Sequence, residues 1–514
     1  MKNKFCGMLA VTLLTSAVHA ETFNVTRMDD PVPDGCQANN CSLREAVISA
    51  DQTPAKDTIV LPAGIYLIDL DGNDSGENTG DLDINSDMDF IGAPSTIDGQ
   101  SLGRMMDIRS DANVSLQNIT LRNANTSLDT NGALNGGALQ INGGSLTLDN
   151  VTFSDNRTQT LGGGIYAFGG AVINIIDSNF ENNIAARGAA INASTGISVR
   201  NTVFRGNRAD LIALGSGAAA YLTGSTSDSL FEDVIFDQNL ATGSGGAVYF
   251  TGRSLTIEGV IATGNRSTSR SGGMLTVPGT SHAKQVVISS AMFDGNSAID
   301  DGGAISFSSD QDTLNIQHSS FVGNLASDNG GALYLTGGDV TVTNDTFSGN
   351  EATDDGGAIY VFGAVLTLHH LTFSAGAANR GSALAVNGSA NINSVELANN
   401  LIDGNCFISD TDSVSSLGGN VEGTGDSCDL DSADDLVSQS DVQLGLQPLK
   451  DTAGNTPTHK LSAASVARGQ GVAAICLSVE IDQLFENRGS PCNSGADESD
   501  TVFRDGFESD QDSA

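Results

Sequence analysis

Aspartates recur at one position of a repeated pattern in the second half of the sequence. Asp300, Asp328 and Asp354 each lie seven residues after a phenylalanine, and Asp301 and Asp355 directly follow two of them. If the repeats stack as neighbouring strands about 4.8 Å apart, these carboxylates repel one another unless a cation screens them. Ca²⁺ prefers such oxygen ligands in proteins. The aspartates therefore predict either a calcium site or a set of solvated acidic turns.

Tyrosines also recur at one position of the pattern. Two pairs, Tyr221 with Tyr249 and Tyr334 with Tyr360, come from successive repeats. Stacking between neighbouring strands would stabilise a sheet. If the rings are instead accessible, the same residues form an aromatic ridge that could bind a glycan or a protein. Both interpretations follow from the spacing.

The repeat that carries these residues is clearest between Gly330 and Asn350, GGALYLTGGDVTVTNDTFSGN. Its alternating apolar residues indicate three short strands joined by two tight bends. Sequence repeats of this length are typical of solenoids, and the strand content favours a parallel β-helix of about thirteen coils. The phenylalanine of an F-x-x-N element marks each coil, at Phe153, Phe180, Phe204, Phe236, Phe293, Phe321, Phe347 and Phe373, with weaker copies at Leu121, Ala262 and Leu397.

Two other positions of the repeat have structural interpretations. The residue three before each marker, from Asn118 to Ser394, is Asn, Asp, Gly, Ser or His, which predicts a left-handed bend. His318 and His370 are then bend residues rather than ligands or bases. The asparagine of F-x-x-N predicts a ladder of amides that hydrogen-bond between coils.

The chain divides into five parts. Residues 1–20 carry Lys2 and Lys4 before an apolar run, as in a secretory signal peptide. Residues 21–56 include a capping box of Ser42 and Glu45, and we expect their short helix to cap the core. We expect coils over residues 57–405, a region that closes the far end over 406–498, and an acidic tail over 499–514.

Cysteine number and charge constrain the compartment and the partners. Six cysteines remain after the signal peptide, as expected for disulfides in an oxidising compartment. Sequence proximity alone pairs Cys36 with Cys41, Cys406 with Cys428 and Cys476 with Cys492. The net charge of −39 argues against nucleic acid as a partner. No apolar stretch after residue 20 has the length of a membrane helix, and we expect a monomer without a cofactor other than Ca²⁺.

Several motifs resemble known bacterial surface proteins. The segment Cys41-Ser-Leu-Arg-Glu-Ala46 resembles the N-terminal motif of CSLREA-type surface proteins. The paired GGA and F-x-x-N elements are similar to repeats of chlamydial polymorphic outer membrane proteins, within the pectate-lyase-like superfamily. Residues 456–498 resemble a choice-of-anchor extension. The resemblance implies a right-handed parallel β-helix, exported to the medium or the outer surface of a Gram-negative bacterium.

The resemblance also implies where an enzyme would place its chemistry. β-helix enzymes that act on acidic polysaccharides carry their catalytic residues on the outward side of the first strand. The outward residues there are Gln140, Tyr166, Asn192, Tyr221, Tyr249, Thr276, Ser306, Tyr334, Tyr360 and Ala385. None of them is a carboxylate, lysine, arginine or histidine, whereas a lyase needs a base and a glycosidase needs a carboxylate pair.

The sequence thus favours an exported, non-catalytic β-helix surface protein that acts in adhesion or in protein or glycan interaction. Tyr221, Tyr249, Tyr334 and Tyr360 are its candidate binding residues. One alternative is a polysaccharide lyase or hydrolase that uses Asp300, Asp328 and Asp354. A second alternative is a structural envelope protein.

Overall fold

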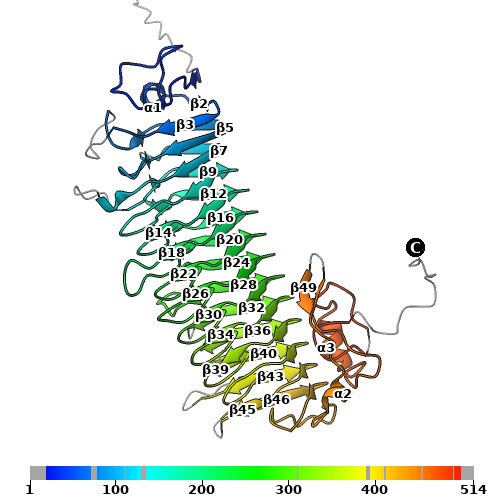
Figure 1. Ribbon diagram of the computed structural model, residues 1–514. Coiled ribbons are helices and arrows are strands. Elements are labelled where there is room, and N and C mark those ends of the chain that lie inside the picture. Colours follow the sequence, from blue (N-terminus) through cyan, green and yellow to red (C-terminus); the bar gives the residue numbers. More distant parts are fainter. Residues whose placement is uncertain are drawn as a thin grey trace, which may run out of the picture.

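The computed structural model describes residues 19–70, 78–109, 111–128, 135–309, 311–388, 394–409, 412–452, 455–489 and 491–498. The predicted signal peptide, apart from its last two residues, and the predicted acidic tail lie outside these ranges. The described chain forms a right-handed parallel β-helix, a rod whose coils stack in sequence order (Figure 1). At strand spacing its length is on the order of 60 Å.

The first strands of the coils form a sheet of thirteen parallel strands within the described residues. Its strands are β4 (Leu82–Ile84), β6 (Met106–Ile108), β8 (Leu139–Asn142), β11 (Ile165–Phe168), β15 (Ile191–Ala193), β19 (Ala220–Leu222), β23 (Val248–Phe250), β27 (Leu275–Val277), β31 (Ile305–Ser308), β35 (Leu333–Thr336), β39 (Ile359–Phe362), β42 (Leu384–Val386) and β45 (Cys406–Ile408).

The second strands form a ladder in which each strand pairs in parallel with the next. Its strands are β1 (Thr22–Asn24), β2 (Asp57–Leu61), β5 (Met88–Asp98), β7 (Asn113–Arg122), β9 (Ser145–Asp149), β12 (Val172–Ile176), β16 (Ile197–Arg200), β20 (Asp228–Glu232), β24 (Ser254–Glu258), β28 (Gln285–Ser289), β32 (Thr313–Gln317), β36 (Asp339–Thr343), β40 (Val365–His369), β43 (Ser394–Ala398) and β46 (Ser413–Gly418).

The third strands form a ladder that joins the second through β5 and β7, which run through both. Its strands are β3 (Gly64–Leu67), β10 (Thr152–Ser154), β13 (Asn179–Glu181), β17 (Val203–Arg205), β21 (Ile235–Asp237), β25 (Ile261–Thr263), β29 (Met292–Asp294), β33 (Ser320–Val322), β37 (Thr346–Ser348), β41 (Thr372–Ser374), β44 (Leu401–Ile402) and β47 (Val421–Glu422).

Some coils contain a fourth strand that the sequence analysis did not predict. These two-residue strands follow the ladder asparagines and form a small parallel sheet. They are β14 (Ile184–Ala185), β18 (Arg208–Ala209), β22 (Leu240–Ala241), β26 (Arg266–Ser267), β30 (Ser297–Ala298), β34 (Leu325–Ala326) and β38 (Glu351–Ala352).

The core is a narrow aliphatic column with an aromatic edge. The marker phenylalanines are buried and stack in two runs, broken where Ala262 replaces the ring. Within the runs the ring centroids are 4.7 to 5.2 Å apart. Beside them the predicted asparagine ladder is present, with Nδ2 of each residue from Asn156 to Asn324 donating to Oδ1 of the next.

The predicted bend position is also present, with one correction near the C-terminal end. Asn118, Asn344, His318 and His370 all have positive φ. However, Phe373 pairs with Ile402, whereas the sequence analysis placed the next marker at Leu397. Leu397 pairs with Leu368 on the second strand, so the bend of this coil is Asn399 and not Ser394. The marker was misplaced because this coil has no phenylalanine there.

The N-terminal end of the rod is covered by α1 (Leu43–Ala50), and a short 3₁₀ helix (Thr126–Leu128) follows β7. Ser42 and Glu45 form the expected capping box at the start of α1. Arg44 of this helix is fully buried and forms an ion pair of 2.8 Å with Asp30. The disulfide Cys36–Cys41 closes the loop before the helix.

The parallel coils continue past the expected boundary at residue 405. β45, β46 and β47 pair with the strands of the preceding coil, so the solenoid extends to Glu422. The disulfide Cys406–Cys428 joins this last coil to the following segment. Cys428 is buried in the main core, and Leu430 packs against this core. Residues that follow β47 therefore close this end of the rod.

The rest of the C-terminal region follows a path that the sequence did not indicate. It contains α2 (Asp441–Leu444), the hairpin β48 (Lys450–Thr452) and β49 (Asn455–Thr458), and α3 (Ala473–Ser478). Instead of remaining at the end, residues 455–498 run back along the side of the rod (Figure 1). We call residues 455–498 the strap. It covers the outward hydroxyls of Ser320, Thr346 and Thr372, which are at most 2% exposed.

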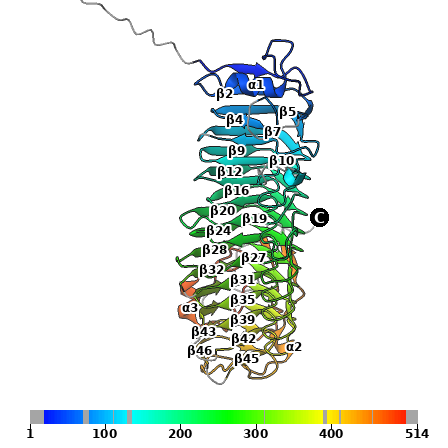
Figure 2. The same cartoon turned by 90° about the vertical axis from the view of Figure 1, so that its left-hand side faces the viewer.

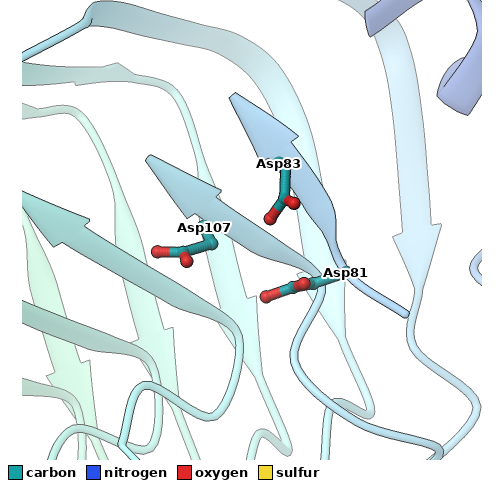
Figure 3. Close-up of side chains that lie close together, drawn as sticks. All are labelled: Asp81, Asp83 and Asp107. Atoms are coloured by element: carbon teal, nitrogen blue, oxygen red, sulfur yellow. The ribbon is translucent and has the colours of Figure 1, made fainter. Parts of the chain in front are cut away.

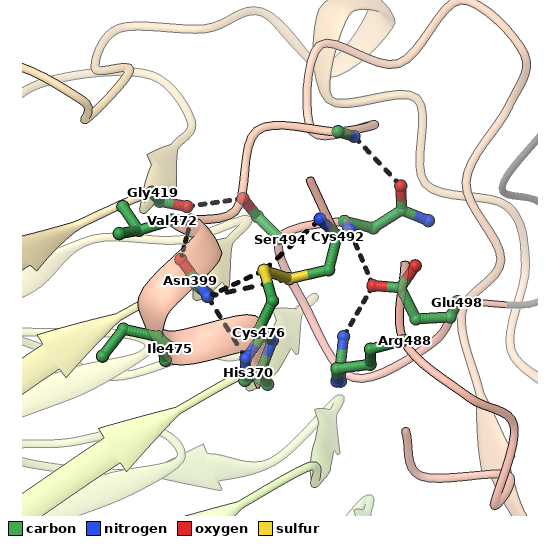
Figure 4. The surroundings of a disulfide bond; sticks show 12 residues. His370, Asn399, Gly419, Val472, Ile475, Cys476, Arg488, Cys492, Ser494 and Glu498 are labelled. Carbon is green, nitrogen blue, oxygen red and sulfur yellow. Dashed lines mark hydrogen bonds and ion pairs between the residues drawn. A yellow bond between two sulfur atoms is a disulfide. The ribbon is translucent and has the colours of Figure 1, made fainter. Parts of the chain in front are cut away.

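The bend residues of four successive coils bind the strap. His318 stacks on Phe485, and Asn344 donates to the Ile481 carbonyl at 2.8 Å. His370 and Asn399 lie beside the disulfide Cys476–Cys492 (Figure 4). The predicted bend role of the two histidines is therefore accompanied by a second role as a docking surface for the strap.

The same surroundings contain a buried ion pair. Arg488 and Glu498 of the strap are 2.8 Å apart, and their side chains are at most 1% exposed. Burial raises the pKa of Glu498 to about 7 although Arg488 opposes the shift. Burial also lowers the pKa of the His370 imidazole well below its usual value, and the nearby Arg488 adds to this.

Candidate binding face

The outward side chains of the first-strand sheet lie in register along the rod. From Gln140 to Ala385 their order is the one expected from the sequence. The column extends further towards the N-terminus, where Gln140 pairs with Asp107 and Asp107 with Asp83. The expectation that this column has no carboxylate is therefore correct only from Gln140 onwards. The first coils were missed because they lack the marker phenylalanine.

The missed residues belong to a compact charged cluster (Figure 3). Asp81, Asp83 and Asp107 have carboxylate oxygens within 4.8 Å of one another. Arg104 contacts Asp81 at 2.7 Å, and Arg109 contacts Asp83 at 2.7 Å and Asp107 at 2.5 Å. Because two guanidiniums offset three buried carboxylates, this cluster is an internal ion network that ties β4 to β6.

The tyrosine pairs stack as the first of the two interpretations expects. The rings of Tyr221 and Tyr249 are 4.8 Å apart and those of Tyr334 and Tyr360 are 5.3 Å apart, nearly parallel in both pairs. Tyr360 is only 8% exposed, whereas the other three rings are half-buried. Two coils with small outward residues, Thr276 and Ser306, separate the pairs. The rings thus form two separate stacks rather than one continuous ridge.

The structure brings three of the five predicted acidic residues together. Asp300, Asp301 and Asp328 have carboxylate oxygens within 4.8 Å of one another, on the turns that precede β31 and β35. Burial, together with Asp300 and Asp328, raises the pKa of Asp301 to about 6, although Asn329 donates to it. Burial, and also Asp301, raises the pKa of the Tyr334 phenol. The carboxylates therefore flank the tyrosine stack.

The other two predicted acidic residues differ from these three. Asp354 is exposed, and its backbone N–H donates to the carbonyl of Asp328 at 2.9 Å. Asp355 is buried and forms an ion pair with Arg380. Arg380 therefore already satisfies Asp355, so Asp355 is not available to share a calcium ion with the other carboxylates.

A groove lies at the opposite edge of the same face, past the ends of β27, β31, β35 and β39. Figure 2 shows these four strands above one another in the sheet. The volume of the groove is about 570 Å³. The second outward residue of each of three strands contributes to it, namely Ser308, Thr336 and Phe362. The hydroxyl of Thr336 donates to the hydroxyl of Ser308 at 2.6 Å. The sequence analysis missed this groove because loops after β27 and β31, which vary between repeats, form its wall.

We call the surface bounded by the acidic turns and the groove the β27–β39 face. Its three parts run along the strands, with carboxylates before β31, β35 and β39, a small residue or tyrosine at the start of each strand, and the groove at the end. Before β27 the equivalent residues are Arg270 and Ser271, and Ser271 donates to Asp300. Such a surface can hydrogen-bond to a ligand and contact it with aromatic rings. Within the described residues, no helix is both long and apolar enough to cross a membrane.

Comparison with known proteins gives local sequence similarity and a distant structural likeness. A model of the Chlamydia polymorphic membrane protein repeat matches residues 150–167, 233–251 and 346–361. No curated protein matches the chain. The crystal structure of tailspike protein 3 (TSP3, orf212) of bacteriophage CBA120 is similar over 74% of this chain, at 13% identity and a TM-score of 0.33. The similar region spans 60% of the tailspike chain.

Proposed function

We propose that the protein is an exported, non-catalytic β-helix rod that binds a glycan or a protein at a cell surface through the β27–β39 face. The observation that carries this proposal is the joint presence on one face of the Tyr334 ring, the acidic turns and the 570 Å³ groove. Concave sites with a few polar groups and aromatic walls are typical of ligand binding.

Two other observations support the location. The three disulfides are consistent with an oxidising compartment outside the cytoplasm. The matched repeat model is named after membrane proteins of Chlamydia. The predicted signal peptide would provide the route of export, and the CSLREA-like motif is consistent with a surface protein.

The proposal is tested by binding of the labelled protein to a glycan array and to intact cells. We expect Tyr334→Ala to weaken binding about two- to tenfold, because a ring contact contributes roughly 0.5–1.5 kcal/mol. Tyr166→Ala is the matched control, since Tyr166 occupies the same position on β11, away from the groove. Equal loss in both variants, or no binding of the wild type, would contradict the proposal. Tyr360 is unsuitable for this test because its buried ring also supports the fold.

One observation favours an enzyme as the second candidate. Asp301, with its pKa raised to about 6, lies beside Asp300 and Asp328. Glycosidases use such a pair, one carboxyl group held protonated near neutral pH and one ionised. In that case Asp300, Asp301 and Asp328, with Asp354 on the next coil, would hydrolyse a polysaccharide. Turnover of polygalacturonate or of a neutral polysaccharide, with or without calcium, that is abolished by Asp301→Asn would establish it.

A further inference from the structure

We infer that Lys284 and Asp312 are joined covalently, by an isopeptide bond between Nζ of the lysine and Cγ of the aspartate. The bond links two neighbouring coils of the rod. It goes beyond the proposed function, because it modifies the chain itself and does not depend on what the β27–β39 face binds. The burial of the two side chains, the contact between them and the groups that hold them all point to it.

The two residues are buried at a position that other coils fill with small side chains. Lys284 and Asp312 come directly before β28 and β32, which pair in register, so they occupy the same position of successive coils. Both side chains are 0% exposed. The next two coils carry Gly338 and Ala364 at this position. Burial of an ion pair costs free energy that the attraction between the charges rarely offsets in full. Conversion of the pair into one neutral amide removes both charges.

The contact between the two side chains is close but is not an ordinary hydrogen-bonded ion pair. Nζ of Lys284 lies 2.6 Å from Oδ2 of Asp312. Among the described residues, this buried oxygen has no partner in hydrogen-bond geometry, and that includes Nζ. The nitrogen is therefore packed against the carboxyl group of the aspartate. Reacting groups that are held together in this way have effective molarities on the order of 10⁵ M or more.

Hydrogen bonds hold both reacting groups in place. The backbone N–H of Lys284 donates to Oδ1 of Asp312 at 2.7 Å, and the Lys284 ammonium donates to the Thr280 hydroxyl at 2.9 Å. Nε2 of His282 is 3.0 Å from the Thr251 carbonyl, so this nitrogen carries the proton of the ring. Nδ1 of His282 is then free of a proton and can accept from the Thr280 hydroxyl, 3.3 Å away. Thr280 is thus a positioning residue for Nζ.

The bond can form without any other reactant. Nζ passes one proton to Oδ2, which leaves a neutral amine beside a carboxylic acid. The lone pair of Nζ then attacks Cγ of Asp312, and the backbone N–H of Lys284 stabilises the negative charge that develops on Oδ1. The bond between Cγ and Oδ2 breaks, and Oδ2 takes a second proton from Nζ and leaves as water. The third proton stays on the amide nitrogen, and Oδ1 becomes the amide carbonyl oxygen. Exclusion of water from the site then protects the amide from hydrolysis.

The experiment is mass spectrometry of the purified wild-type protein after reduction of its disulfides, first intact and then after protease digestion. We expect the chain to be lighter than its calculated mass by one water molecule and to yield a branched peptide that contains both Lys284 and Asp312. Lys56 and Asp89 are the matched control, because their ion pair is also 2.6 Å long but their side chains are 45% and 32% exposed. These two residues should appear in separate peptides.

A chain of full calculated mass would overturn the inference. A loss of water without the branched peptide would also overturn it, since dehydration at another aspartate lowers the mass equally. Because the wild type carries this test, no variant has to fold for it to be decisive.

Two variants connect the bond to the residues named here. Lys284→Met combined with Asp312→Asn removes the amine and both charges and keeps side chains of similar size, so its chain should have the full calculated mass. A loss of one water in this variant would overturn the inference. Thr280→Val keeps the shape of the side chain and removes the hydroxyl that holds Nζ, so it should lower the linked fraction severalfold. A linked fraction equal to that of the wild type would overturn the positioning role of Thr280.

Discussion

The side-chain amide of Asn207 donates a hydrogen bond of 3.0 Å to Oδ1 of Asn239 on the next coil. The same amide nitrogen also donates to the Phe180 carbonyl at 2.9 Å. In return, Oδ1 of Asn207 accepts from Nδ2 of Asn183 at 3.0 Å and from its backbone N–H at 3.1 Å. One fully buried side chain therefore satisfies polar groups of three coils.

Removal of this side chain should destabilise the rod strongly. We expect Asn207→Ala to lower the free energy of unfolding by about 3 kcal/mol or more, because it leaves the buried Asn183 backbone N–H without its partner and removes hydrogen bonds to the Asn183 side chain, the Phe180 carbonyl and Asn239. Urea denaturation followed by far-UV circular dichroism measures the loss. Asn174→Ala, at a half-buried outward position of β12, is the control and should change little. Equal losses in the two variants would show that the ladder contributes no special stability.

Asp301 should make stability depend on pH near neutrality. Its pKa of about 6 in the folded protein is above the ordinary value of 3.8. Its contribution is therefore fully present below about pH 3.8 and is lost as the pH rises through 6. We expect Asp301→Asn to have a higher Tm than the wild type at pH 7.5 and the same Tm at pH 3.5. A difference in Tm between the two proteins that stays constant from pH 3.5 to pH 7.5 would contradict the raised pKa of Asp301.

Measuring the same two Tm values with added Ca²⁺ separates the two interpretations of the acidic turns. A calcium ion held by Asp300, Asp301 and Asp328 would offset their repulsion. Ca²⁺ would then raise the Tm of the wild type at pH 7.5 and leave that of Asp301→Asn nearly unchanged. If Ca²⁺ raises neither Tm, the turns are solvated carboxylates.

His370 should make the docking of the strap sensitive to acid. Its pKa is lowered in the folded state, so its contribution is present above pH 6.5 and is lost as the pH falls below that value. We expect His370→Asn to show a smaller increase in hydrogen exchange of the strap between pH 7 and pH 5 than the wild type. Asparagine suits this bend, since Asn344 and Asn399 occupy the equivalent positions with positive φ. His282→Asn, outside the strap contact, should behave like the wild type.

The disulfide Cys476–Cys492 should stabilise the strap and not the central coils, which the described residues of the strap do not contact. The bond closes a segment with a sequence separation of 16, for which chain entropy predicts about 3 kcal/mol. We expect replacement of both cysteines by serine to increase hydrogen exchange in residues 455–498 while β20 and β24 remain protected. Loss of protection in those central strands would show that the strap supports the whole rod.

The sequence predicted the coils because each coil repeats the same inward residues. The period of two, the F-x-x-N element and the left-handed bends identified the inward side of most strands and the asparagine ladder. The weaker markers Leu121 and Ala262 were also placed correctly, and prediction failed at two other places where a coil lacks its phenylalanine. Ile402 replaces it near one end, and the coils that carry Asp83 and Asp107 precede the first marker phenylalanine, Phe153, so their place in the outward column was not recognised.

The candidate site was only partly predictable for a different reason. The tyrosines and aspartates belong to the repeat, so their spacing brought Tyr334 and Asp328 to one face. The groove depends on the loop after Val277, and the strap depends on contacts between residues 137 positions apart, such as Asn344 and Ile481. One signal of the strap was present. The bend position changes from residues such as Asp233 and Ser290 to His318 and His370, which can accept hydrogen bonds or stack on a ring.

The strap imposes an order on folding. Each coil of a solenoid contacts only its neighbours, so coils can form and fray one at a time from an end. The strap can dock only after the coils from His318 to Asn399 exist, because its binding groups come from four of them. Such distant contacts form late, since the chain between them must first be closed into a loop. Once docked, the strap links these coils into one cooperative unit, and the C-terminal end of the rod can no longer unravel coil by coil.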